Sequence, residues 1–170
     1  SGQTLDGFAV ANAIQLDAPT NTYDIGPYDE ANDLWDYAVG NSYFTAAKGY
    51  STERTLNAGA GVATFSGNGI YSGNQTVNLV RSGNGWNCIG NPFTSAIKAR
   101  GTGTDNFLGA NGSLLDPNYA ALYFWNNSAG NYEAMSNSTI TEYVSVGQGF
   151  FVKPAIAGTS VAFNPNVQVH

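Results

Sequence analysis

Apolar and polar residues alternate in short runs along the chain, and each run is bounded by turn-forming residues. The runs are rich in β-branched and aromatic residues, which is typical of strands, and helical periodicity is weak throughout. Ser-Gly-Asn runs at 66–68, 72–74 and 82–84 mark tight turns between them. The strands predicted in this way are 61–65, 75–80, 85–89, 120–125, 149–153 and 160–163. Many short strands at such spacing predict an all-β fold, an antiparallel, jelly-roll-like β-sandwich with little helix.

An internal repeat refines this prediction. Residues 28–35 and 125–132 each hold an aromatic residue, a six-residue polar loop and a second aromatic residue. Two further matches follow in the same order, at an offset of about 100 residues, and together they predict two pseudo-repeated β lobes. These matches pair 47–50 with 147–150, and 62–68 with 160–166. We expect residues 1–70 to form the first unit and 71–170 to form a linking strand and the second unit, within one domain.

The first unit has no counterpart of the strand that opens the second unit. Residues 85–92, Gly-Trp-Asn-Cys-Ile-Gly-Asn-Pro, begin the second unit, and nothing similar precedes Ser1. We expect either that the sequence is cut there or that another strand fills the gap. An unpaired strand edge can recruit a strand from another chain, which predicts self-association. The alternative is that residues 5–10 fold back and cover the edge.

Residues 85–97 also carry a resemblance to a known family. They read Gly-Trp-Asn-Cys-Ile-Gly-Asn-Pro-Phe-Thr-Ser-Ala-Ile. This run resembles a motif of Bacteroidota cell-surface and secreted proteins that commonly reads Gly-Trp-Asn-Leu-hydrophobic-Gly-Asn-Pro-Tyr-Pro-Ser-Ala-Ile. Residues 163–170 look like the end of the same module, and the resemblance covers the chain from about Tyr28. It implies a β-rich fold, export by the type IX secretion system and an extracellular or cell-surface location, but no ligand. Cys88 replaces the usual Leu, and the sequence shows no sorting domain.

Charge narrows the range of partners. Charged residues are 11% of the chain, against about 25% in typical globular domains, and the net charge is −6. The six Lys and Arg residues are scattered, whereas nucleic acids and anionic membranes require a basic patch. We therefore expect no nucleic-acid partner. No apolar run approaches the ~18 residues of a membrane span, so we expect no membrane insertion.

Catalytic constellations are not evident in the sequence. The single histidine is His170, the last residue, and the single cysteine is Cys88. Triad catalysis and zinc binding both require positioned His or Cys residues, so neither is expected. Cys88 lies in a predicted strand on the same face as Trp86, and we expect it to be a buried, inert thiol.

Clustered carboxylates suggest a different chemistry. Asp29, Glu30 and Asp33 lie in one predicted hairpin loop, with further acidic residues on either side. A solvated loop is the simple interpretation, and a calcium site is the alternative because Ca²⁺ favours several oxygen ligands. A second oxygen-rich stretch, with the same two interpretations, contains Asp105, Asn106, Asn111 and Asp116.

Aromatic residues are the best candidates for ligand binding. Trp35 and Tyr132 close the two predicted hairpins, and each has a polar neighbour, Asp33 or Asn131. Exposed rings can stack on a sugar while the polar neighbours bind its hydroxyl groups, so we predict a glycan site at these four residues. Most other aromatic residues should fill the core. The residues predicted to be buried are Trp86, Ile89, Phe65, Phe163, Val161 and Phe150.

Three functions remain in competition. The first is a non-catalytic extracellular structural or self-associating module, and the second is a carbohydrate-binding or adhesion module. The third is a glycan-active enzyme, which would require two carboxyl groups facing each other across a cleft. We expect no enzymatic activity.

Overall fold

Antiparallel strands dominate the computed structural model, in which helix makes up only 11% of the chain, and the all-β prediction is confirmed. The structure describes residues 2–55, 61–67 and 69–169. Ser1, Asn68 and His170 therefore lie outside the described residues. In chain order the elements are α1 (Leu5–Ala11), β1 (Leu16–Asp17), β2 (Thr22–Tyr23), β3 (Ile25–Asp29), β4 (Leu34–Trp35), β5 (Tyr50–Thr52), β6 (Gln75–Asn78), β7 (Asn87–Gly90), β8 (Ile97–Arg100), α2 (Phe107–Asn111), η2 (Gly112–Leu114), β9 (Ala121–Asn126), β10 (Asn131–Ser136), β11 (Glu142–Val144), β12 (Gly149–Val152), β13 (Ser160–Phe163) and η3 (Pro165–Val167).

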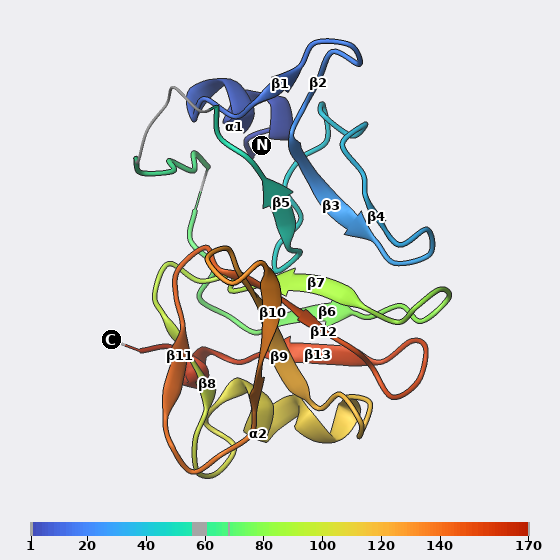
Figure 1. Cartoon of the computed structure of the whole chain (residues 1–170). Coiled ribbons are helices and arrows are strands. Elements are labelled where there is room, and N and C mark those ends of the chain that lie inside the picture. Colours follow the sequence, from blue (N-terminus) through green and yellow to red (C-terminus); the bar gives the residue numbers. More distant parts are fainter. Residues whose placement is uncertain (1, 56–60, 68, 170) are drawn as a thin grey trace.

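The elements are arranged in two lobes (Figure 1). The first lobe holds α1 and strands β1 to β5, including a sheet of order β4-β3-β5. The second lobe is built on a four-stranded sheet of order β10-β9-β12-β7, beside the pairs β13-β6 and β11-β8. Each lobe has its own hydrophobic core, centred on Phe8 and Ile25 in the first and on Phe107, Phe150 and Phe163 in the second.

Strand alternation gives the four-stranded sheet two different faces. Leu122, Phe150 and Ile89 are 0–1% exposed and face the core of the second lobe. Their neighbours along the strands, Tyr123 and Phe151, pair with each other and lie on the opposite face. A sheet with apolar residues on both faces requires cover on both sides. The β3–β4 hairpin of the first lobe supplies this cover on the aromatic face, where Tyr28 and Trp35 contact Phe151.

The burial predictions were right at four positions and wrong at two. Ile89, Phe150, Val161 and Phe163 are buried, as expected. Phe65 is 60% exposed, and residues 61–65 form no strand. Trp86 is only half-buried, because it lies beside the aromatic face of the sheet rather than in the core.

The complete two-lobe repeat is not confirmed. The two hairpins agree, since Tyr28 pairs with Trp35 as Trp125 pairs with Tyr132. The closing segments differ, because β13 pairs with β6 whereas 61–67 pairs with no strand among the described residues. The shared geometry is therefore local, and the predicted overlay of Phe65 on Phe163 places an exposed residue against a buried one.

Strand β7 joins the two lobes. On one side it pairs with β12. It also forms backbone hydrogen bonds with the residues just before β5. Gly49 N–H donates to the Cys88 carbonyl at 3.0 Å, and Gly90 N–H donates to the Ala47 carbonyl at 2.9 Å. Residues 5–10, which were the alternative cover for the edge, belong to α1, which the Thr4 side chain caps by accepting from Gly7 N–H at 3.1 Å. The outer edge of β5 remains the edge of its sheet.

Candidate functional site

Aromatic side chains from both lobes enclose a pocket of about 300 Å³. The β3–β4 hairpin contributes one side, and the four-stranded sheet with the turn before β7 contributes the other. The lining residues are Tyr28, Asp33, Trp35, Trp86, Tyr123, Tyr132 and Phe151. Neither lobe forms this pocket alone, so the packing of the hairpin on the sheet creates it.

Phe151 forms the floor of the pocket. It is 9% exposed, and three rings meet it edge-to-face, with centroid distances of 5.0 Å to Tyr28, 5.7 Å to Trp35 and 5.4 Å to Tyr132. Edge-to-face contacts fix the ring orientations, because the positive ring edge is attracted to the negative face. The walls of the pocket are therefore preorganised.

Trp86 and Tyr123 form the opposite wall. Their rings are T-shaped with centroids 4.8 Å apart, and the Lys153 ammonium lies 5.4 Å from the centroid of Trp86. The same ammonium lies 4.8 Å from the centroid of Tyr119. Lys153 therefore makes a cation–π contact with a ring of this wall, although it does not itself line the pocket.

The polar rim of the pocket is built around Asp33. Its carboxylate accepts from the Tyr28 hydroxyl and, at 2.6 Å, from the Asn84 side-chain amide. Asn84 also donates to the Tyr28 oxygen at 2.8 Å. Burial, followed by the hydrogen bond to Asp33, raises the pKa of Tyr28 to about 12, so its hydroxyl stays neutral and keeps donating. Asp33 adopts a left-handed backbone with φ of 56°, which the turn requires and which Asp tolerates.

Glu30 fixes the hairpin beside the sheet. It is 3% exposed, and its carboxylate accepts from Ser82 N–H (3.0 Å), Ser82 Oγ (2.8 Å), Gly83 N–H (2.8 Å) and Gly85 N–H (2.6 Å). Burial favours the neutral acid, but these donors outweigh it and hold the pKa of Glu30 below its usual value. The buried charge is therefore stabilised by a nest of N–H groups rather than by a cation.

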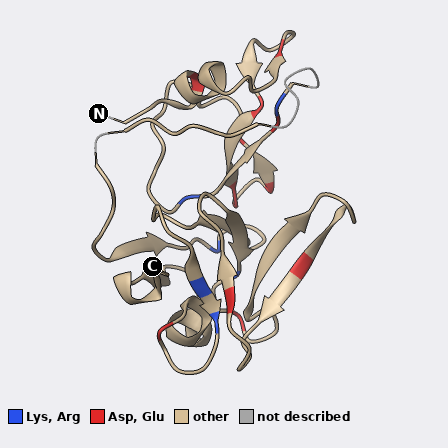
Figure 2. Cartoon of the chain, turned by 90° about the vertical axis from the view of Figure 1, so that its left-hand side faces the viewer, with Lys and Arg blue, Asp and Glu red and all other residues tan. Residues whose placement is uncertain are grey.

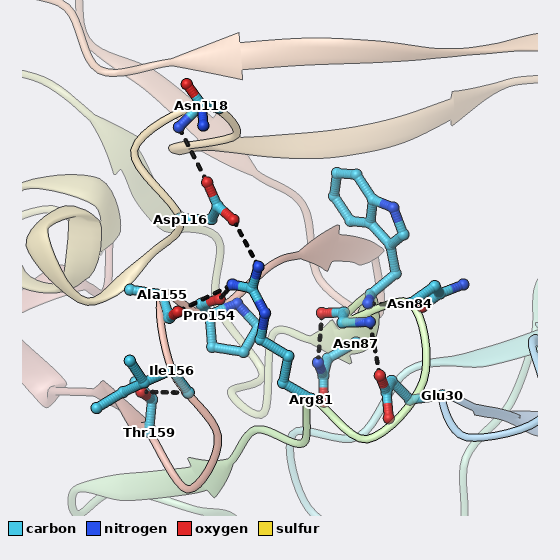
Figure 3. A network of polar contacts seen from close by, with 12 residues as sticks. Glu30, Arg81, Asn84, Asn87, Asp116, Asn118, Pro154, Ala155, Ile156 and Thr159 are labelled. Atoms are coloured by element: carbon cyan, nitrogen blue, oxygen red, sulfur yellow. Dashed lines mark hydrogen bonds and ion pairs between the residues drawn. The ribbon is translucent and has the colours of Figure 1, made fainter.

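Arg81 anchors the same turn from its other end. Its guanidinium donates to the carbonyls of Pro154 and Ala155 and pairs with Asp116 at 3.0 Å. Figure 3 shows Arg81 reaching these partners close to Glu30 and Asn84. The turn that positions Asn84 and Trp86 is thus held to both the hairpin and the second lobe.

Three of the four predicted glycan-site residues meet in the pocket. Trp35, Tyr132 and Asp33 all line it, although about 100 residues of chain separate Tyr132 from the other two. Asn131 instead lies at the exposed start of β10, opposite Asn126 and outside the lining. Sequence reasoning missed Tyr123 and Phe151 as site residues. The sequence does contain a signal for them, namely strands with apolar residues on both faces. Such strands require a second covering layer.

The predicted calcium ligands point in different directions. Asp29 accepts from the N–H groups of Ala31 and Asn32 at 3.0 and 3.3 Å and so caps its own turn. Glu30 faces the 82–85 turn, and Asp33 faces Tyr28. Among the described residues no group of three or more His, Cys, Asp or Glu side chains is placed to hold a metal ion.

The second oxygen-rich stretch is also dispersed. Asp105 pairs with Lys98 at 2.6 Å, and Asn106 caps α2 by accepting from Gly109 N–H at 2.7 Å. Asn111 holds the backbone of β13, and Asp116 faces Arg81. The hydrogen bonds and ion pairs of the fold account for these four side chains.

Cys88 has the environment of an unreactive thiol. It is half-buried on the sheet, and burial raises its pKa to about 12. A thiol with such a pKa is neutral at physiological pH and therefore a poor nucleophile.

Charged residues are sparse, and in Figure 2 their ribbon positions are spread over both lobes. No helix in the described ranges has the length and apolar character needed to cross a bilayer. Comparisons with protein-family models, curated proteins and solved structures give no match for this chain.

Proposed function

We propose that this chain is a non-catalytic, extracellular carbohydrate-binding module that holds a sugar residue in the aromatic pocket. The observation that carries the proposal is the convergence of Trp35, Tyr132 and Asp33, from two lobes, on one preorganised cavity. The volume of about 300 Å³ is at the small end of ligand pockets, which favours a single terminal sugar ring.

The chemistry of the lining supports a sugar. Tyrosine and tryptophan rings offer faces for the apolar C–H surface of a pyranose, and the Asp33 carboxylate with the Asn84 amide offers partners for its hydroxyl groups. An aromatic pocket can also bind a quaternary ammonium group. The Lys153 ammonium already lies over Trp86, and its charge would repel a second cation. The neutral, hydroxyl-rich ligand is therefore favoured.

A glycan array followed by calorimetry on the best ligand tests the proposal. We expect saturable binding, weakened about tenfold for each ring removed in Trp35→Ala and Tyr132→Ala. Tyr43→Ala is the matched control, because this tyrosine is 56% exposed and lies outside the pocket lining. An empty array, equal affinity in the double variant, or binding of choline in place of sugars would contradict the proposal.

A structural, self-associating module is the second candidate. The outer edge of β5 favours it, because no strand in the described part of the chain pairs with this edge and edge strands recruit other strands. Light scattering at several concentrations tests this candidate independently of the glycan proposal. A monomer at every concentration would exclude self-association. Export to the cell surface, suggested by the resemblance of residues 85–97, is part of both proposals and is tested by locating the protein in cell fractions.

A further inference from the structure

A large apolar groove lies beside the outer edge of β5, away from the aromatic pocket. Its cavity volume is about 630 Å³, and it runs between α1, β5 and the segments 61–67 and 69–71 of the first lobe. Residues 90–94 and the turn at 146–149 of the second lobe border it on the remaining side. Its apolar lining includes Phe8, Ile25, Phe44, Tyr50, Phe65 and Tyr71. Among these, Phe65 and Tyr71 are 60% and 50% exposed, so large rings border the groove without being covered.

Both lobes have an asparagine at the end of a helix that makes two hydrogen bonds to the backbone of a later segment. Asn111 Oδ1 accepts from Ala162 N–H at 2.9 Å, and its amide donates to the Ala162 carbonyl at 3.0 Å. In the first lobe, Asn12 Oδ1 accepts from Thr64 N–H at 2.6 Å, and its amide donates to the Thr64 carbonyl at 3.1 Å. One asparagine at the end of a helix therefore holds the closing segment in both lobes.

The aromatic contacts beside these asparagines also correspond. The rings of Phe8 and Phe65 are tilted by 31° at a centroid distance of 4.7 Å, and those of Phe107 and Phe163 by 43° at 4.9 Å. The turns that lead into the next strands agree as well, with φ of 58° at Ala47 and 69° at Gly147. The helix, the closing segment and this turn thus make matching local contacts in the two lobes, although the closing segments differ in their strand pairing.

The two lobes differ in what fills the space between these parts. In the second lobe, β12 pairs with β7, and β13 pairs with β6. Leu79, which follows β6, and Ile89 of β7 are each 1% exposed and complete the core. In the first lobe β5 is an edge strand, and 61–67 pairs with no strand among the described residues. The groove occupies the place that β6 and β7 fill in the second lobe.

We propose that the groove binds a polypeptide segment from outside residues 1–170, which adds two strands in the way that β6 and β7 do. One added strand would pair with the edge of β5, and the other would pair with 61–67. The segment would carry apolar residues at alternate positions, because Ile89 lies opposite Phe150 in the second lobe and Val77 lies opposite Val161. Backbone pairing would supply affinity, and the rings of Phe8, Phe44 and Phe65 would supply the apolar surface.

Residues 75–91 of this chain provide a probe with the required pattern. We would add this sequence as a synthetic peptide to the whole chain and follow the backbone amides by NMR. We expect saturable 1:1 binding, with slower hydrogen exchange at Tyr50, Thr52 and the residues 61–67. A peptide with Asp in place of Val77, Leu79 and Ile89 is the negative control and should not bind.

Two variants localise the binding. Phe65→Asp changes a ring that lines the groove and is 60% exposed, so the fold should survive while peptide affinity falls at least about tenfold. Val10→Asp, on α1 but outside the groove lining and 69% exposed, should leave the affinity unchanged.

Several results would overturn this inference. They are the absence of peptide binding, protection of β12 and β13 instead of β5, and equal affinity in the Phe65→Asp variant. Dimerisation of the chain that protects the same amides would identify a second copy as the occupant and would also overturn it. Glycan binding is a separate readout at a separate pocket, so either proposal can fail without the other.

Discussion

The carboxylate of Glu30 accepts hydrogen bonds from both the N–H (3.0 Å) and the hydroxyl (2.8 Å) of Ser82, 52 positions further along the chain. Two further N–H groups of the same turn complete the set of donors. This contact ties the hairpin that carries Trp35 and Asp33 to the turn that carries Asn84 and Trp86. The buried charge of Glu30 therefore helps to hold the two sides of the aromatic pocket together, beside the ring contacts on Phe151.

Replacing that charge should loosen the junction. In Glu30→Gln the amide group places N–H donors against the N–H groups of the turn, so part of the buried set loses its acceptor. We expect a loss of about 2–3 kcal/mol in the free energy of unfolding, measured by urea denaturation. Glu133→Gln, in the exposed strand β10, is the control and should unfold like the parent. An equal midpoint for Glu30→Gln and the parent would show that the contact contributes nothing.

The same residue predicts a pH dependence. The pKa of Glu30 is lowered in the folded chain from its ordinary value of 4.5. A lowered folded pKa adds stability above the unfolded pKa, and this stability is lost as the pH falls through the folded value. The gap in stability between parent and Glu30→Gln should therefore be constant from pH 7 to about 5 and shrink at lower pH. A gap that widens on acidification would contradict this assignment.

Two phenylalanines at matching positions should differ in their contribution to stability. Phe163 is 0% exposed and Phe65 is 60% exposed. Phe163→Ala should cost about 3–5 kcal/mol, because it removes a buried ring and leaves a cavity. Phe65→Ala should cost less than about 1 kcal/mol, because most of its surface is already in water. Equal losses in urea denaturation would mean that Phe65 is covered in solution.

The asparagine that holds the segment 61–67 can be tested by proteolysis. Asn12→Ala removes both side-chain hydrogen bonds to Thr64, and we expect faster cleavage within 61–67. Cleavage at the hairpin loop between β9 and β10, far from Asn12 in the chain, should not change. Unaltered cleavage within 61–67 would show that other contacts hold this segment.

Cys88 should react slowly with thiol reagents in the folded chain. Its pKa of about 12 leaves it neutral at pH 8, and its sulfur is half-buried against Gly49. We expect the reaction to be at least about a hundredfold faster in denaturant, where the thiol has an ordinary pKa and full access. A comparable rate in native buffer would show that the sheet around β7 opens readily.

Local features of the fold were predictable because local residues specify them. The sequence places a strand at 160–163, and the structure forms β13 (Ser160–Phe163) there. The two hairpins were also visible as aromatic residues flanking polar turns, and each pair of aromatic residues is in register. Three of the four proposed glycan-site residues line one pocket, but hairpin geometry explains only why Asp33 and Trp35 are neighbours. The packing of the two lobes brings Tyr132 to them.

The sequence by itself determined the all-β class, the turns and the alternation of faces, because these depend on backbone preferences over a few residues. The tertiary structure decided which faces are covered. Residues 61–65 have the pattern of a strand but no partner strand among the described residues, and a strand is stable only when its backbone groups are paired. Trp86 and Glu30 are two side chains whose burial differs from the expectation. A tryptophan expected in the core faces a pocket, and a carboxylate expected in solvent is buried, because the burial of each side chain depends on a segment far away in the chain.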